Sequence, residues 1–132
     1  MPKDDSIRLR HMLDAAREVM RSTDGRVRAD LESDHIWTLG LVKCIEIIGE
    51  AAAQIGSTTR EAHSQIPWTR IVAMRNRLVH AYFDIDFDQV WATARVDIPH
   101  LAKLLEKAVR GTHGASPSSD PAEPADPQPP TA

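Results

Sequence analysis

The sequence lacks a second cysteine, because Cys44 is the only one among 132 residues. A disulfide within the chain is therefore excluded, as is usual for proteins of a reducing compartment. Cys44 lies in the apolar stretch LGLVKCIEII, where we expect it to pack as a small buried residue. The cysteine content thus agrees with a cytoplasmic protein.

A long apolar run is also missing. A membrane-spanning helix needs about 20 consecutive apolar residues, and no segment of the sequence approaches that length. The N-terminal stretch MPKDDSIRLRHML has no apolar core of the kind that a secretory signal contains. We therefore predict a soluble cytoplasmic protein that has no membrane partner.

Aromatic residues are scarce, at 5% of the chain, although hydrophobic residues make up 42%. That apolar content is enough to bury the core of one domain. Ala, Leu, Ile, Val, Arg and Glu are plentiful instead, and this balance favours helix over sheet. The composition predicts a single all-α domain.

Basic residues are absent after Arg110, whereas Asp120, Glu123 and Asp126 follow it and account for the formal net charge of -3. The preceding part of the chain is therefore neutral overall. A broad basic face of the kind that grips duplex DNA is not expected. Any binding of phosphate groups must be local.

The segment 111–132 holds six of the nine prolines and almost no large apolar residue. Such a segment cannot bury enough apolar surface to offset the entropy lost on ordering. We predict a Pro/Ala/Ser-rich, acidic and disordered tail over 111–132, and a folded domain over 1–110.

Apolar residues recur at helical spacing through the folded domain and predict four helices. A short turn over 26–33 would make a fifth, and Pro99 should kink or break the last helix near residues 96–99. Short connections favour an antiparallel four- to five-helix bundle. The predicted helices are 5–22, 34–56, 67–83 and 87–110, and the expected apolar stripe of the second is Ile36, Leu39, Val42, Ile45, Ile48, Ala52 and Ile55.

Four polar residues interrupt the apolar third helix in the stretch MRNRLVHAYF: Arg75, Asn76, His80 and Tyr82. On a continuous helix Asn76 and His80 share a face, whereas Arg75 and His80 lie about 140° apart. Only the length of the arginine would let both reach one cleft. Arginine binds phosphate, histidine transfers protons near neutral pH, and asparagine can orient either one. This combination suits cleavage of RNA, whose 2′-hydroxyl is a built-in nucleophile that needs no metal.

A purely structural interpretation is also open. Arg75 can pair with Glu46 or Glu50 of the second helix, His80 can be a partly buried histidine, and Tyr82 can lie at the edge of the core. Helix geometry alone favours this interpretation. The two glutamates are at the same time our candidates for supporting residues that orient Arg75.

Two carboxylate-x-x-histidine pairs, Glu32 with His35 and Asp97 with His100, are similar to those of di-metal helical bundles. Such a site needs two further inward carboxylates and intact helices. The first pair lies at the start of a predicted helix, and the second contains Pro99. We therefore predict no metal site.

The run from Arg75 to Tyr82 resembles the R-x4-H-x-Y motif of the HepT toxins, a branch of the HEPN superfamily of helical ribonucleases. EIIGEAA at 46–52, IPWTRIVAMRN at 66–76 and YFDIDFDQVW at 82–91 are similar to that family too, in the expected order. The resemblance covers most of residues 5–110 and identifies 1–110 as a HEPN-like helical domain.

This resemblance implies an all-helical homodimer in which the motifs of both subunits line one cleft and cleave RNA without a metal or cofactor. Arg75 would contact the scissile phosphate, His80 would act as acid or base, and Asn76 would fill the polar position after the arginine. The catalytic residues implied are thus Arg75 and His80.

The resemblance further implies the toxin of a HepT/MntA type VII toxin–antitoxin system. The cognate antitoxin is a minimal nucleotidyltransferase that transfers AMP from ATP to the motif tyrosine, here Tyr82, and can assemble with the toxin into a larger hetero-oligomer. The bulk and charge of AMP beside His80 would exclude RNA. The alternative is a non-catalytic HEPN module that binds a nucleotide or presents a substrate to a nucleotidyltransferase.

Overall fold

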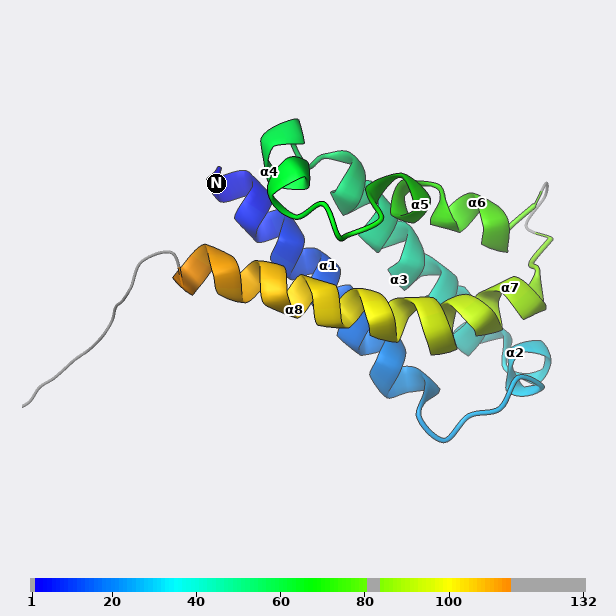
Figure 1. Ribbon diagram of the computed structural model, residues 1–132. Coiled ribbons are helices and arrows are strands. Elements are labelled where there is room, and N and C mark those ends of the chain that lie inside the picture. Colours follow the sequence, from blue (N-terminus) through cyan, green and yellow to red (C-terminus); the bar gives the residue numbers. More distant parts are fainter. Residues whose placement is uncertain (1, 81–83, 115–132) are drawn as a thin grey trace, which may run out of the picture.

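The computed structural model describes residues 2–80 and 84–114, and their regular structure is helical apart from one isolated bridge between Val79 and Ile85 (Figure 1). The predicted all-α fold is confirmed. The helices are α1 (Lys3–Thr23), α2 (Asp30–Ser33), α3 (His35–Ala53), α4 (Ser57–Ala62), α5 (Trp68–Val72), α6 (Met74–Leu78), α7 (Phe87–Ala92) and α8 (Ile98–Gly114), with a π-helical segment (Thr93–Asp97) between the last two.

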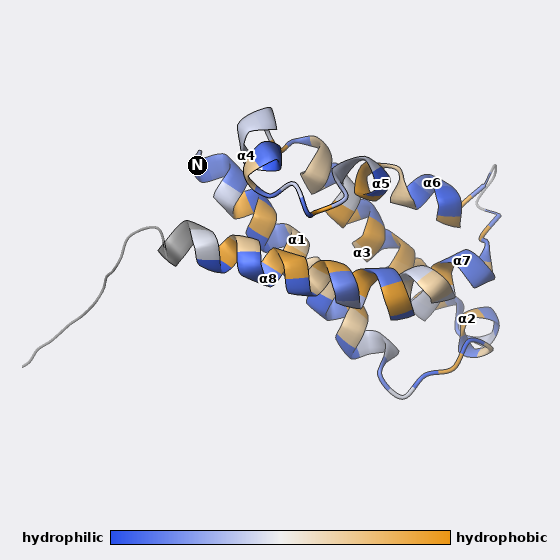
Figure 2. Ribbon diagram, viewed as in Figure 1, coloured by the Kyte–Doolittle hydropathy of each residue, from blue (hydrophilic) through white to orange (hydrophobic). Residues whose placement is uncertain are grey.

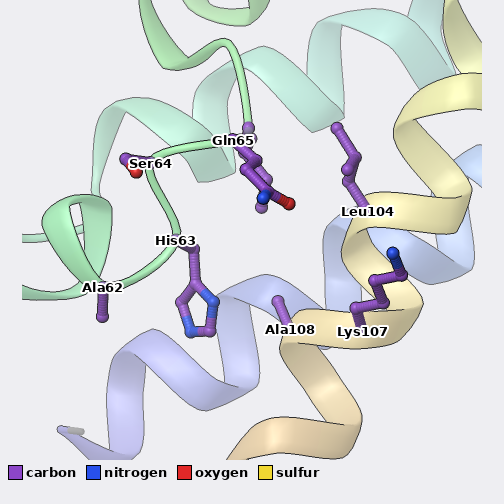
Figure 3. A pocket seen from close by; sticks show the side chains of 8 residues that line it. Ala62, His63, Ser64, Gln65, Leu104, Lys107 and Ala108 are labelled. Atoms are coloured by element: carbon purple, nitrogen blue, oxygen red, sulfur yellow. The ribbon is translucent and has the colours of Figure 1, made fainter.

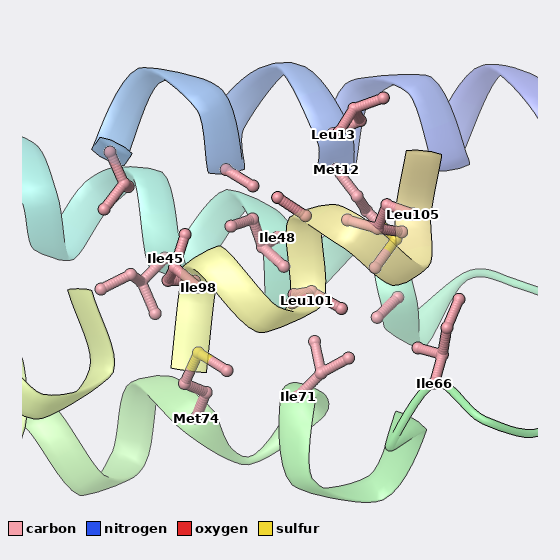
Figure 4. Close-up of a cluster of buried hydrophobic side chains, with 14 of the residues drawn as sticks. Met12, Leu13, Ile45, Ile48, Ile66, Ile71, Met74, Ile98, Leu101 and Leu105 are labelled. Atoms are coloured by element: carbon pink, nitrogen blue, oxygen red, sulfur yellow. The ribbon is translucent and has the colours of Figure 1, made fainter. Parts of the chain in front are cut away.

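Three long helices form the body of the bundle. Helix α1 packs against both α3 and α8, and α5 and α6 pack against the other side of α3. Apolar residues recur along the long helices between hydrophilic ones (Figure 2), and their buried side chains meet in one core (Figure 4). The labelled members of that core are Met12, Leu13, Ile45, Ile48, Ile66, Ile71, Met74, Ile98, Leu101 and Leu105.

The apolar stripe of α3 is right in its second half and wrong at its start. Ile45, Ile48, Ala52 and Ile55 are buried as predicted, but Ile36 is 79% exposed and Leu39 is 40% exposed. Thr38 and Leu41 take their place in the core. Thr38 can do so because its hydroxyl donates a hydrogen bond to the carbonyl oxygen of Leu31 (2.6 Å), so burial leaves no polar group unpaired.

The predicted helix over 67–83 is wrong, because the chain forms two short helices and then leaves the helical conformation. Ala73 separates α5 from α6, and Val79 is extended, with φ −129° and ψ 121°. The amide of His80 then donates to the oxygen of Asp84 (2.8 Å), and the amide of Asp86 donates to that of Leu78 (2.8 Å). These two hydrogen bonds across a reversal of the chain replace the helical ones.

The predicted disruption near Pro99 is confirmed as the π-helical segment that precedes it. The proline ring clashes with the carbonyl four residues earlier, and proline has no amide to donate. The wider π turn, in which the amide of Ile98 donates to the oxygen of Thr93, adjusts the backbone just before the ring. Helix α8 then continues to Gly114, and the rest of the predicted tail lies outside the described residues.

Within the described part of the chain, no helix is both long and apolar enough to cross a membrane.

A buried carboxylate fastens the start of α1 to the connection between α3 and α4. Asp5 is only 4% exposed and accepts hydrogen bonds from the hydroxyl of Thr59 (2.6 Å), the amide of Gly56 (3.3 Å) and the guanidinium of Arg8 (3.4 Å). The hydrogen bond from Thr59 is the main cause that holds the pKa of Asp5 below its ordinary value, against the opposing effect of burial. Charged Asp5 therefore stabilises the folded state.

We expect Thr59→Val to lower the free energy of unfolding by about 1 to 2 kcal/mol, because the buried carboxylate loses its shortest hydrogen bond. Since the folded-state pKa of Asp5 lies below the ordinary value of 3.8, this stabilisation is present above that pH and is lost as the pH falls through the folded-state pKa. Urea denaturation of both proteins at neutral and acidic pH measures the effect.

The matched control is Thr58→Val, because Thr58 is the exposed neighbour in the same helix. This variant should unfold like the wild type. An equal loss in the two variants, or a loss in Thr59→Val that does not shrink in acid, would contradict the role given to Asp5.

Candidate functional site

An open groove of about 270 Å³ lies between α3 and the pair α5–α6. Four of the residues singled out in the sequence meet there, two from each side. The lining residues are Glu46, Gly49, Glu50 and Ala53 of α3, and Val72, Arg75 and Asn76 of the segment that contains α5 and α6.

Gly49 lets the two sides of this groove approach one another. A Cβ atom at Gly49 would lie 3.2 Å from the backbone oxygen of Ile71 and 3.6 Å from that of Val72. Backbone atoms move less readily than a flexible side chain, so the glycine permits an approach that any larger residue would push apart. This contact brings α6, and with it Arg75, close to the outer side of α3.

Arg75 forms an ion pair with Glu46 across the groove, with 3.4 Å between its Nε and the carboxylate. The Nε atom is buried and donates no hydrogen bond within the described structure, so the contact is electrostatic in character. Glu46 also accepts a hydrogen bond from Lys43 (3.2 Å). The pairing agrees with the structural interpretation, yet the side chain of Arg75 remains 38% exposed and accessible from the groove.

Asn76 and Glu50 are both exposed at the groove. No side-chain hydrogen bond engages either of them within the described structure, so their polar groups face solvent. They are therefore available to a ligand that enters the groove.

His80 lies beyond the end of α6 and does not line the groove. The expected sharing of a helical face by Asn76 and His80 is wrong, because the helix ends at Leu78. The side chain of His80 is 54% exposed, and its Nε2 lies 3.6 Å from the carboxylate of Asp86. Tyr82, the remaining residue of the motif, lies outside the described residues.

Two neighbours of the motif were not recognised as site residues from the sequence. Asp86 caps α7 by accepting a hydrogen bond from the amide of Gln89 (3.1 Å), and it also faces His80. Arg77 buries Nε and Nη2 without an acceptor in the described structure. The chain reversal that brings Asp86 near His80 has no signal in the helical pattern, and nothing in the sequence distinguishes Arg77 from an exposed arginine.

Potential metal ligands do not gather anywhere in residues 2–80 and 84–114: no group of three or more His, Cys, Asp and Glu residues is arranged to hold an ion. Asp97 instead contacts Arg70, with 3.5 Å between carboxylate and guanidinium.

Comparison with known proteins shows to which family the chain belongs. The family model described as "Ribonuclease HepT-like" matches residues 12–108. "Putative RNase TTE0752" of Caldanaerobacter subterraneus is 32% identical over 102 residues, which are 77% of this chain and 91% of that protein. "Probable ribonuclease HepT" of Thermococcus cleftensis is 37% identical over 78 residues, which are 59% of this chain and 71% of that protein.

A third relative, "Putative RNase MJ1216" of Methanocaldococcus jannaschii, is 38% identical over 79 residues, and these span 60% of this chain and 65% of that protein. No solved structure matches the chain significantly. The matched region 12–108 contains the whole groove and the stretch from Arg75 to Asp86. With the family model matching well over half of its length, the chain belongs to the HepT-like ribonuclease family.

Proposed function

We propose that this chain is an endoribonuclease that cleaves RNA without a metal ion and serves as the toxin of a toxin–antitoxin pair. One observation carries the proposal: in a chain of the HepT-like family, Arg75 and Asn76 line an open groove beside two glutamates, and His80 follows on an exposed turn. The relatives named as ribonucleases support RNA as the substrate.

In this proposal, Arg75 and Asn76 bind the scissile phosphate, and His80 moves the proton. A base takes the proton of the 2′-hydroxyl, the 2′-oxygen forms a bond to phosphorus, and the bond from phosphorus to the 5′-oxygen breaks. An acid returns a proton to the leaving 5′-oxygen, so the products are a 2′,3′-cyclic phosphate and a 5′-hydroxyl. Asp86 orients the imidazole of His80, and Glu46 orients the guanidinium of Arg75.

The active form in this proposal is a homodimer. The groove holds Arg75 but not His80, so a second copy would complete the site. Ile36 and Ile47 are exposed on α3 and lie about 20° apart around its axis, so they form one apolar face with the exposed Leu39. Val72, on the wall of the groove, is exposed as well. Such a face is typical of a surface that a partner covers.

The off switch in this proposal is the transfer of AMP to Tyr82 by a cognate minimal nucleotidyltransferase. The phenol oxygen attacks the α-phosphorus of ATP, pyrophosphate leaves, and the phenol loses its proton. Tyr82 is the only tyrosine in the chain and lies two residues from His80. A bulky anion at this position would repel the phosphates of RNA.

We expect Arg75→Ala and His80→Ala to stay folded and to cleave RNA about 10²- to 10⁴-fold more slowly, because each loses a group that acts on the reacting phosphate. Cleavage is measured in EDTA with protein expressed without its antitoxin, and intact mass excludes prior modification. His11→Ala is the matched control, because His11 is an exposed histidine on α1.

Full activity of either variant would remove that residue from the catalytic site. A wild type that cuts only after Mg²⁺ is added would rule out the metal-independent reaction. If unmodified wild type does not cut at all, the chain is the non-catalytic module.

The dimer prediction is tested by Ile36→Asp combined with Ile47→Asp. A charge at these positions should prevent a second copy from covering the face, so we expect a monomer that has lost RNA cleavage. Light scattering after size-exclusion chromatography reports the mass. Val96→Asp, at an apolar residue 66% exposed on the π-helical segment, should leave the dimer intact; a wild type that cleaves RNA as a monomer would refute the proposed assembly.

Incubation with ATP and the cognate nucleotidyltransferase should add one AMP to the wild type and none to Tyr82→Phe, because phenylalanine lacks the attacking oxygen. The modified wild type should lose RNA cleavage. Intact mass and RNA cleavage are measured on the same sample. Modification of Tyr82→Phe, or full cleavage by a completely modified wild type, would contradict the switch.

A further inference from the structure

The outer face of α8 carries basic side chains only. From Ile98 to Arg110, the exposed residues are separated by three, four and three positions, so they share one face of the helix. The acidic residue of this stretch, Glu106, is half-buried and pairs with Arg17 of α1 (3.1 Å). The four residues of this basic face are His100, Lys103, Lys107 and Arg110.

The lysine and arginine side chains of the basic face form no ion pair within the described structure. These residues are Lys103, Lys107 and Arg110. The dipole of the helix does not account for them either, because its effect is confined to about the last turn and α8 continues to Gly114. Three cations that form no ion pair within the described structure, with the imidazole of His100 on the same face, make a local surface suited to a polyanion.

This face differs from that of the other long outer helix. The exposed residues of α1 mix both signs, with Arg10 and Arg21 beside Asp14 and Glu18. Residues 1–110 are neutral in total, so the overall charge does not reveal the segregation on α8. The local phosphate binding expected from the sequence thus has a second candidate location besides Arg75.

A hollow of about 250 Å³ lies beside Lys107, between α8 and the connection from α4 to α5 (Figure 3). His63, Ser64 and Gln65 come from the connection, and Leu104 and Ala108 come from α8. The lining includes no carboxylate. The hollow therefore combines several apolar side chains with an imidazole, an amide and an ammonium group, and such groups can take up an unstacked base and its phosphate.

A smaller cavity of about 70 Å³ lies between the basic face of α8 and the segment that contains α5 and α6. It is lined by Arg70 and Met74 on one side and by Asp97 and His100 on the other. Met74 directly precedes Arg75, and Arg70 adds another cation, 58% exposed and paired only loosely with Asp97 at 3.5 Å. Basic groups thus extend from His100 toward the segment that holds the motif.

We propose that the basic face of α8 and the hollow beside Lys107 bind single-stranded RNA away from the scissile bond. The choice of RNA as the ligand rests on the proposed function. The phosphates contact Lys103, Lys107 and Arg110, whose positions follow each other at about 4.5 to 6 Å along the helix axis. One unpaired base enters the hollow against His63. This face positions the substrate and takes no part in the reaction.

The test measures binding of a fluorescein-labelled single-stranded RNA by anisotropy, in the His80→Ala background so that the RNA stays intact. The triple variant Lys103→Gln, Lys107→Gln and Arg110→Gln should bind at least about tenfold more weakly. It should also reduce the slope of log affinity against log salt by about 2, since each phosphate contact on a single strand contributes about 0.7.

The matched control removes three exposed charges from α1 with Lys3→Gln, Arg10→Gln and Arg21→Gln in the same background. Its net charge equals that of the α8 variant. A difference in RNA affinity between the two variants therefore depends on where the charges lie and not on how many there are. His63→Ala should weaken binding several-fold and leave the salt slope unchanged, because stacking releases no counterions.

Equal affinity and slope in the α8 and α1 variants would overturn the proposal, as would a background protein that does not bind RNA. Unchanged affinity in His63→Ala would remove the hollow from the site. Cleavage is assayed separately with His80 intact. A wild type that does not cut RNA, together with weakened binding by the α8 variant alone, would reject the nuclease and retain the RNA-binding face.

Discussion

The position of the candidate site depends on the close contact between α3 and the backbone of α5 at Gly49. The Ile71 oxygen would lie 3.2 Å from a Cβ atom there, so the absence of a side chain sets how near the two segments come. That approach determines the width of the groove and brings Arg75 within 3.4 Å of Glu46. The buried side chains of Ile71 in α5 and Met74 in α6 pack into the core and hold these two helices against it. One glycine thus links the packing of the bundle to the geometry of the groove that Arg75 lines.

The ion pair between Arg75 and Glu46 in the groove is weak enough to be exchanged for another partner. Glu46 pairs with Arg75 across the groove, and both side chains are partly exposed. A pair of this kind contributes about 0 to 1 kcal/mol, so a phosphate with a better geometry can displace the carboxylate at little cost. Lys43 then remains as a partner for Glu46, with which it already shares a hydrogen bond of 3.2 Å. The ion pair with Glu46 is therefore compatible with the role proposed for Arg75, because a pair of this kind does not prevent the guanidinium from binding a phosphate.

The sequence predicted those parts of the fold that depend on local chemistry. Pro99 disrupts the last helix as predicted, because the proline ring and the missing proline amide act over a few residues. The predictions failed where contacts between distant segments determine which residues are buried and where a helix ends. Ile36 has the spacing of a core residue but is exposed, whereas Thr38 is buried because Leu31 supplies a hydrogen-bond acceptor. The apolar residues of 67–83 suit a helix, yet contacts with α3 and the pairing of Val79 with Ile85 divide the segment.

That division changes where the residues of the motif lie. On one continuous helix, Arg75 and His80 would be fixed about 140° apart. In the structure Arg75 belongs to α6, whereas His80 belongs to a reversal held by two backbone hydrogen bonds, from His80 to Asp84 and from Asp86 to Leu78. The helix that carries Arg75 therefore does not hold His80, and Asp86, the cap of α7, faces His80 from the far end of the reversal. Tyr82 lies between the two ends of this reversal in the sequence. In the proposed switch, AMP on Tyr82 would be attached to the segment that carries His80 and not to the helix that carries Arg75.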